Sequence, residues 1–249
     1  MSVNVDIMQK ACYHYANSET GEMFDLPYRV YFPTGYESTK EKTFPLLFFL
    51  HGHGECGTDN RLQIRVLEKE NRLINMIMER DDTVIVAPQC PCNPKYEWVP
   101  VNHAWNTGSR MLTEKPTIGL SAATALLKTV LEKEKIDRTR IYAAGISMGG
   151  YGTWELITRE PQLFAAAIPV CGAGIPSLAA RLTDIAIWAF HGELDNTVPA
   201  SGSRDMYNAI QKVGGTKMRY TEIPGVYHDS WIAAYKTEGL LEWLYAQKK

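Results

Sequence analysis

A serine stands between two glycines in the segment 145–149, which reads Gly-Ile-Ser-Met-Gly. This spacing is typical of a nucleophile elbow, a sharp strand-to-helix turn that exposes a serine hydroxyl above the end of a sheet. The apolar run 141–144 before it predicts a strand, and the run 153–159 after it is compatible with a helix. Glycines are needed around such a serine because the turn is tight and its backbone conformation is unusual. The pattern predicts Ser147 as a nucleophile that attacks an ester carbonyl.

A serine hydroxyl attacks well only if a neighbouring base removes its proton and a carboxylate orients that base. After an elbow of this kind, the acid and then the histidine follow in chain order, each behind a later strand. Of the six histidines, only His228 follows both Ser147 and the best candidate acid. That acid is Asp195, behind the apolar run 185–190, and Glu193 in the same loop is the alternative. We expect Asp195 to hold the His228 ring in the productive tautomer without taking the proton.

Attack on a carbonyl places negative charge on its oxygen, so two N–H donors must already point there. One is expected from Met148, at the start of the helix after the elbow, where free N–H groups favour an anion. The second is expected from the loop after the apolar run 45–50, with the N–H of His53 preferred and that of Gly54 as the alternative. Together these predict an oxyanion hole made by Met148 and His53.

The same loop supports a rival chemistry, because His51, His53 and Glu55 could be ligands in a metal-dependent hydrolase. Cys90 and Cys92 could also ligate a metal, but no second closely spaced Cys or His pair accompanies them. The rival leaves the elbow and its partners unexplained as a set. The sequence therefore predicts no metal and no other cofactor.

These residues require an α/β architecture to position them. Short apolar runs predict strands, and apolar residues at helical spacing predict helices. Strands alternating with helices indicate a doubly wound, mostly parallel sheet flanked by helices, here preceded by an antiparallel hairpin that ends near Phe32. We expect one domain over residues 1–249. The predicted strands are 45–50, 83–87, 141–144, 166–170, 185–190 and 218–223, the predicted helices are 64–78, 118–130, 206–213 and 231–246, and 89–116 is expected as a long loop.

Composition excludes several classes of protein. The chain has 249 residues, of which 45% are hydrophobic and 22% charged, which suits a globular protein with a sizeable core. Its net charge of −2 and the lack of a basic stripe argue against nucleic-acid binding. The start does not resemble a secretory signal, and no stretch approaches the roughly 20 apolar residues of a membrane span. We expect a cytoplasmic protein with reduced cysteines, although a chain with its leader removed would look the same.

At these motifs the chain resembles a bacterial branch of the α/β-hydrolase superfamily, the predicted peptidase or phospholipase/carboxylesterase-like branch, which is also similar to feruloyl and acetylxylan esterases. The resemblance runs from about Tyr28 to the C-terminus, and Cys56 departs from it because a basic residue is common there. It implies a carboxylesterase for short or aromatic acyl groups, with Ser147, Asp195 and His228 matching the family triad. The segments that carry it are 50–55, 88–91 with Trp98 downstream, 147–154, 191–199 and 228–231.

The expected partner is a small-molecule ester, with plant cell-wall esters suggested by the feruloyl esterase likeness. Trp98, Trp105, Tyr227 and Trp231 are interpreted as an aromatic wall for an acyl or sugar group, although packing is the usual role of such residues. Three alternatives stay open: a serine peptidase acting on small peptides, the metal-dependent hydrolase, and a non-catalytic binding module. The sequence makes no prediction of oligomeric state.

Overall fold

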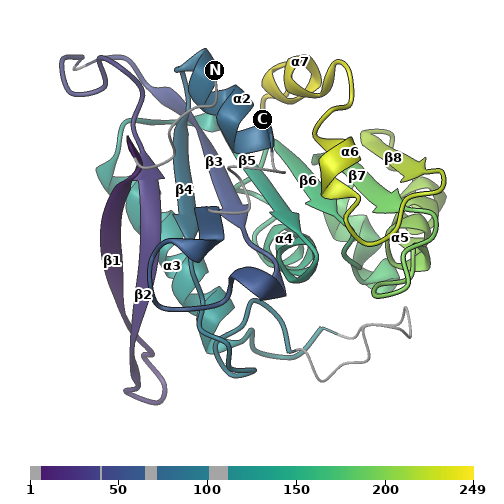
Figure 1. Cartoon of the computed structure of the whole chain (residues 1–249), viewed down its shortest axis with the longest axis horizontal. Coiled ribbons are helices and arrows are strands. Elements are labelled where there is room, and N and C mark those ends of the chain that lie inside the picture. The colour runs from purple at the N-terminus through teal and green to yellow at the C-terminus, as the bar shows by residue number, and fades with distance from the viewer. Residues whose placement is uncertain (1–6, 40, 65–71, 101–111) are drawn as a thin grey trace.

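The computed structural model describes residues 7–39, 41–64, 72–100 and 112–249. Within them, eight strands form one sheet in the order β1-β2-β4-β3-β5-β6-β7-β8 (Figure 1). The strands are β1 (Gln9–Ala16), β2 (Met23–Tyr31), β3 (Phe44–Leu50), β4 (Val84–Pro88), β5 (Ile136–Ile146), β6 (Ala166–Val170), β7 (Ala186–Gly192) and β8 (Met218–Ile223). The helices are α2 (Arg72–Arg80), α3 (Ile118–Lys133), α4 (Met148–Arg159), α5 (Ser201–Lys212), α6 (Trp231–Ala234) and α7 (Leu240–Tyr245), with short 3₁₀ turns η2 (His53–Glu55) and η3 (Pro176–Leu182).

The sheet is antiparallel at its start and parallel over the rest. β1 pairs with β2 and β2 with β4 in antiparallel register, whereas every neighbouring pair from β4 to β8 is parallel. β3, β4 and β6 are buried along their whole length, as expected for central strands that are covered on both faces. The predicted fold class and leading hairpin are confirmed.

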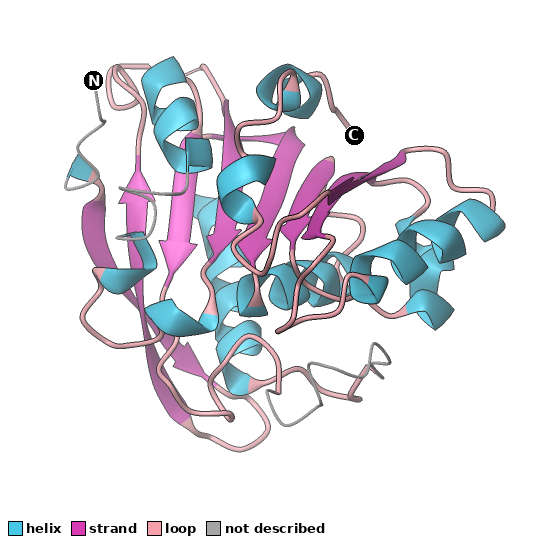
Figure 2. Cartoon of the chain, turned by 45° about the vertical axis from the view of Figure 1, so that its right-hand side comes forward, coloured by secondary structure: helices cyan, strands magenta, loops and turns pink. Residues whose placement is uncertain are grey.

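Two layers of helix cover the sheet (Figure 2). One apolar cluster joins the sheet to α3, α4 and α5, and a second joins the opposite side chains of the strands to α2, α6 and α7. Because the strands from β4 to β8 run the same way, their carboxyl ends meet at one edge of the sheet. The loops after β3, β5, β7 and β8 therefore converge there, and these loops carry the predicted site residues.

The C-terminal segment differs from the prediction of one helix over 231–246. It forms two short helices, α6 and α7, with Gly239 between them in the left-handed region at φ 76°. Each half keeps an apolar face on the second cluster, so the spacing of apolar residues looks helical on both sides of the break. The spacing of apolar residues does not reveal that the φ angle of Gly239 is positive, and this is why the prediction of one continuous helix was wrong.

Other boundaries shift modestly. β5 is longer than the predicted strand 141–144, and α4 begins five residues before the predicted helical run 153–159. In the expected loop 89–116, the described stretches 89–100 and 112–116 contain no strand or helix, and Trp105 lies outside the described residues.

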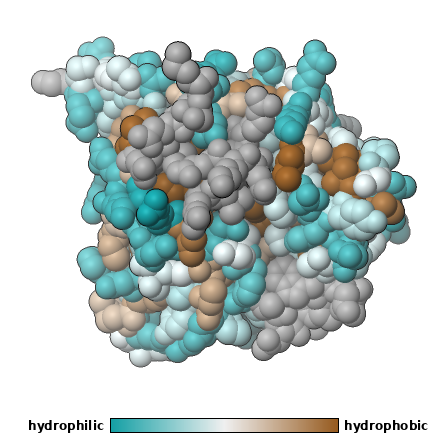
Figure 3. All heavy atoms as spheres, in the orientation of Figure 1, coloured by the Kyte–Doolittle hydropathy of each residue, from teal (hydrophilic) through white to brown (hydrophobic). Residues whose placement is uncertain are grey.

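None of the helices in the described residues has the length and apolar character needed to cross a bilayer. On the face seen in Figure 3, the described residues are mostly hydrophilic, and apolar side chains gather only in small groups.

Candidate active site

Ser147 is the single residue between β5 and α4, so the strand-to-helix turn is as tight as the motif predicts. Its backbone has φ 53° and ψ −118°, a conformation that is uncommon for a residue with a side chain. Two hydrogen bonds hold it there: the Ser147 N–H donates to the Val170 carbonyl at 3.0 Å, and the Ser147 carbonyl accepts from the Tyr151 N–H at 3.0 Å. The surrounding structure thus fixes the strained turn.

The glycines of the elbow are required by close backbone contacts. A Cβ on Gly145 would lie 2.3 Å from the carbonyl oxygen of Gly149, and a Cβ on Gly149 would lie 1.9 Å from that of Leu50. The same Cβ would be 2.6 Å from the carbonyl oxygen of His51. The first turn of α4 therefore rests directly on the end of β3, which brings the elbow beside the loop that follows β3.

We expect Gly149→Ala to lower the free energy of unfolding by about 3 kcal/mol or more, because the added methyl meets backbone that cannot move without displacing β3. Urea unfolding measures the change. Gly54→Ala is the matched control, since a Cβ there meets nothing within 4 Å, and its change should stay within about 0.5 kcal/mol. Equal losses in the two variants would contradict this account of the turn.

The structure brings the three predicted triad residues together. Ser147 Oγ lies 2.8 Å from His228 Nε2, and His228 Nδ1 lies 2.8 Å from Asp195 Oδ2. The Asp195 side chain is fully buried, whereas that of His228 is 22% exposed. The alternative acid, Glu193, is exposed and accepts a hydrogen bond from the Gly225 N–H at 2.9 Å. Of the two acids, it is Asp195 that faces the imidazole.

Asp195 is surrounded by hydrogen-bond donors. Burial acts to raise the pKa of its carboxyl, but hydrogen bonds from His191, His228 and the Val198 N–H outweigh burial and hold the pKa well below its usual range. Oδ1 accepts from the N–H groups of Thr197 at 2.9 Å and Val198 at 2.8 Å. The carboxylate is thus ionised, rigid and oriented toward His228.

His191 is a site residue that the sequence reasoning missed. Its ring is fully buried, with Nε2 3.3 Å from Asp195 Oδ2 and 2.9 Å from the Val198 carbonyl oxygen, and Nδ1 2.9 Å from Ser203 Oγ. Chain order excluded His191 as the base because it precedes the acid. Its position at the end of β7, four residues before Asp195, was the available signal for a supporting role.

The two predicted oxyanion donors lie on neighbouring loops. Met148 is the first residue of α4, and His53 is the first residue of η2, directly beyond the β3 end that supports the elbow. Backbone hydrogen bonds among the described residues involve neither the Met148 N–H nor the His53 N–H. Both groups are placed at helix starts, where N–H groups lack partners within the helix.

The ligand set of the rival metal hydrolase is not gathered. His51 is buried, its Nδ1 lies 2.6 Å from the Gly52 carbonyl oxygen, and its Nε2 accepts a hydrogen bond from the Cys90 N–H at 3.1 Å. Burial lowers the pKa of His51 to about 4, so the ring is neutral at pH 7. Among the described residues, no group of potential ligands within reach of one ion contains both His51 and His53, and none contains Glu55.

The predicted aromatic wall is only partly present. Trp98 is fully buried, donates from Nε1 to the His51 carbonyl at 3.1 Å and packs on Gly152, so the prediction of a substrate contact is wrong for this residue. Tyr227 is 56% exposed, and Trp231 stands perpendicular to the His228 ring with the ring centres 5.7 Å apart. Trp231 therefore lies against the candidate base, and Tyr227 precedes this base directly in the chain.

The mostly parallel sheet with its elbow and the site residues behind later strands define an α/β-hydrolase. Comparison with family models then identifies the branch. The chain belongs to the phospholipase/carboxylesterase family, whose model matches residues 36–237. No curated protein sequence matches the chain.

Solved structures agree with this assignment. A thermostable esterase is 35% identical with a TM-score of 0.83, and the alignment covers 98% of this chain and 64% of that chain. The chain thus spans a little under two thirds of that esterase. A ferulic acid esterase is 19% identical with a TM-score of 0.64, covering 92% and 95% of the two chains. The feruloyl esterase module from Clostridium thermocellum, complexed with sinapinate, is 13% identical with a TM-score of 0.66, covering 97% and 89%. The last two show a shared fold.

Proposed function

We propose that this chain is a serine carboxylesterase, acting as one catalytic domain, in which Ser147, His228 and Asp195 form the triad. The observation that carries the proposal is the unbroken line of contacts from Ser147 Oγ through both nitrogens of His228 to Asp195 Oδ2, each of 2.8 Å. Family membership supports ester hydrolysis as the chemistry.

The arrangement suits two-step acyl transfer. The Nδ1–H group of the neutral His228 ring donates a hydrogen bond to Asp195, so Nε2 carries the lone pair. This lone pair takes the Ser147 hydroxyl proton as Oγ attacks the carbonyl carbon. The imidazolium then donates that proton to the alkoxy leaving group, and an alcohol departs from the acyl-enzyme. In the second step His228 takes a proton from water, and the water oxygen attacks the acyl carbon. As the bond between the acyl carbon and Ser147 Oγ breaks, His228 returns the proton to Oγ, which releases the acid and regenerates Ser147.

In this mechanism the Met148 and His53 N–H groups stabilise the negative oxygen that develops in each step. The elbow supports this role because it holds the Met148 N–H at the start of α4, immediately next to the nucleophile. Close packing of Gly149 on Leu50 and His51 keeps the loop with His53 beside it. Donors fixed before the reaction need no reorganisation when charge appears.

The proposed substrates are small esters with short or aromatic acyl groups, of the acetyl and feruloyl types that occur in plant cell walls. Trp231, which stands perpendicular to the His228 ring, and the exposed Tyr227 next to His228 in the chain support this choice, because both offer aromatic surface to an acyl group. Esters are favoured over peptides because an amide is intrinsically harder to cleave.

A substrate panel tests the proposal. We expect hydrolysis of p-nitrophenyl acetate, p-nitrophenyl butyrate and methyl ferulate, with kcat/KM at least about a hundredfold above that for matched amides, a difference of about 2.7 kcal/mol in barrier height. Faster cleavage of the amides would indicate a peptidase, and no turnover by the folded protein would indicate a binding module. Activity that survives Ser147→Ala but disappears with a chelator would indicate the metal-dependent alternative.

A further inference from the structure

A second group of reactive side chains surrounds Cys56, which directly follows η2 and is buried. Its Sγ lies 3.9 Å from Cys90 Sγ and 4.0 Å from His53 Nδ1. His53 Nδ1 in turn lies 3.6 Å from Glu97 Oε1. Suitable ligand atoms of His53, Cys56 and Glu97 all lie within 4.8 Å of one another. None of these side chains has a task in the proposed triad chemistry.

Glu97 is the unusual member of this cluster. Its side chain is 3% exposed, yet its Oε2 has no hydrogen-bond partner in the described part of the chain. A buried carboxyl group with an unpartnered oxygen is costly unless a cation or donor compensates it. A cation bound in this cluster would supply the partner that the buried Glu97 carboxylate lacks.

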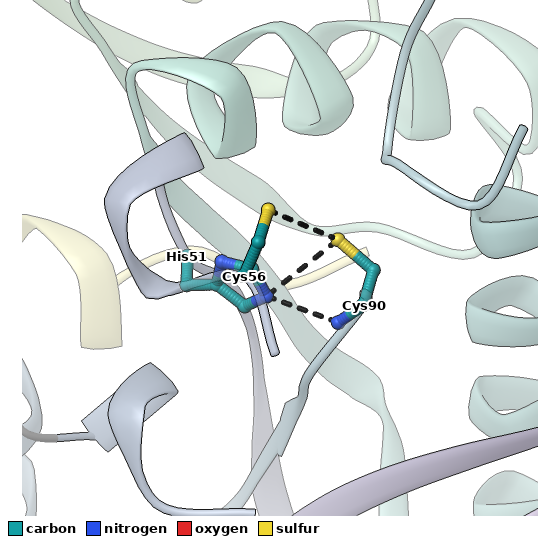
Figure 4. A group of neighbouring side chains, drawn as sticks. All are labelled: His51, Cys56 and Cys90. Atoms are coloured by element: carbon teal, nitrogen blue, oxygen red, sulfur yellow. Dashed lines mark hydrogen bonds between the residues drawn. The ribbon is translucent and has the colours of Figure 1, made fainter. Parts of the chain in front are cut away.

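His51 also lies close to the sulfurs of Cys56 and Cys90, but it is not a suitable donor. Figure 4 shows its Nε2 directed toward both the nitrogen and the sulfur of Cys90, at 3.1 Å and 3.7 Å. The backbone N–H of Cys90 uses the one lone pair of this neutral ring. Metal binding to His51 would leave that buried N–H without a partner.

We propose that His53, Cys56 and Glu97 form a binding site for one Zn²⁺-like cation, because their ligand atoms all lie within 4.8 Å of one another. The Cys90 sulfur lies 3.9 Å from that of Cys56, but among the described residues it belongs to no group of mutually close ligand atoms that contains His53 or Glu97. A thiolate and an imidazole favour Zn²⁺ over Mg²⁺ or Ca²⁺, which prefer oxygen ligands. Binding displaces the proton of the Cys56 thiol and releases it to solvent.

The site would join two loops at the edge of the sheet. His53 and Cys56 come from the loop after β3, and Glu97 comes from the loop after β4. The bound cation would hold the His53 ring, and with it the loop that carries the proposed oxyanion donor. The role is a clamp on that loop and goes beyond the esterase chemistry, in which the cation takes no step.

Titration of the chelator-treated, fully reduced wild-type protein with Co²⁺ tests the proposal directly. We expect one ion per chain, an intense thiolate-to-cobalt charge-transfer band, and loss of that band when Zn²⁺ displaces the cobalt. Reduced protein that binds no Co²⁺, or binds it without the charge-transfer band, would overturn the proposal. So would a protein that instead forms a Cys56–Cys90 disulfide in air and never takes up metal when reduced.

Variants locate the bound ion. Cys56→Ser should weaken binding at least about a hundredfold, because it removes the central ligand. Cys12→Ser is the matched control: Cys12 belongs to a separate, exposed group with His14 and Asp25, and its loss should leave binding unchanged. The reverse pattern would place the metal on the leading hairpin and refute the site. Ser147→Ala should bind normally, which separates this test from that of the proposed esterase activity.

Glu97→Gln distinguishes a ligand from a packing residue, since it keeps the shape and removes the charge. It should weaken Co²⁺ binding about tenfold or more, while the metal-free variant unfolds at the wild-type temperature or higher. Zn²⁺ at a hundredfold excess over its Kd should raise the wild-type Tm by about 5–10 °C and leave that of Cys56→Ser unchanged. An equal rise in Cys56→Ser would show that the stabilising ion binds elsewhere.

Discussion

Replacing Ser147 with alanine should lower kcat for p-nitrophenyl acetate by about 10⁴-fold or more. The hydroxyl is the attacking group in the proposed mechanism, and triad residues act as a unit, so loss of one removes most of the benefit of the others. Steady-state kinetics on the purified variant measure the change. What activity is left would come from substrate binding and the oxyanion donors alone.

The variant should fold normally, which makes this a clean test. Alanine keeps the Cβ of serine, so the strained φ of 53° costs the same in both proteins, and only the 2.8 Å contact with His228 is lost. Ser121→Ala is the matched control, because its hydroxyl donates to the Thr117 carbonyl within α3, remote from the elbow. Its kcat should stay within about twofold of wild type. A Ser147→Ala enzyme that retains a tenth of wild-type activity would refute the nucleophile assignment.

The second large effect is expected for Asp195→Asn, with a fall in kcat of about 10⁴-fold. Asp195 Oδ2 accepts a hydrogen bond from the Nδ1–H group of His228, with 2.8 Å between the two atoms. The proton therefore stays on Nδ1, and Nε2 is free to act as the base toward Ser147. An amide can instead present its NH₂ group to Nδ1, which favours the wrong tautomer of the ring. kcat is measured across a pH series, so that a shift of the pH optimum is not mistaken for the loss of a catalytic group.

Glu193→Gln is the control for this substitution, because Glu193 occupies the same loop and was the competing acid. It is exposed, and its contact with the Gly225 N–H needs only an acceptor oxygen, which glutamine retains. Activity should remain within about twofold of wild type. If Glu193→Gln were the inactive variant and Asp195→Asn the active one, the acid of the proposed triad would have to be reassigned.

Stability offers an independent readout of Asp195. Its pKa is depressed in the folded protein, so its ionisation stabilises the fold above about pH 4, where the unfolded carboxyl is also charged. That contribution is lost as the pH falls toward the folded-state pKa. The difference in free energy of unfolding between wild type and Asp195→Asn should therefore shrink at acidic pH.

Much of this architecture could be predicted from local sequence. Continuous apolar runs gave the buried parallel strands, and β8 has the bounds expected for it. The elbow was predictable because the geometry of this turn is nearly invariant, although the contact that requires Gly149 is made with the end of β3. Chain order then selected Asp195 and His228, which the structure brings to hydrogen-bonding distance of one another.

Features that depend on distant contacts were missed. Trp98 looked available to a substrate, but the packing of α4 against the loop after β4 buries it. His191 looked redundant, yet its ring lies beside Asp195 because the chain turns back between β7 and α5. The break at Gly239 lies within a segment whose apolar spacing suits a helix on either side.

The sequence by itself determined the order of strands and helices, the elbow at Ser147 and the candidates for its partners, since each of these follows from short-range spacing. Only the tertiary structure decided which acid faces His228 and which side chains gather around Cys56. The pairing of β3 with β4 places two loops side by side although Cys56 and Cys90 are 34 residues apart. The carboxyl ends of parallel strands share one edge, so residues far apart along the chain become neighbours there. The local spacing of residue types along the chain gives no information about those contacts.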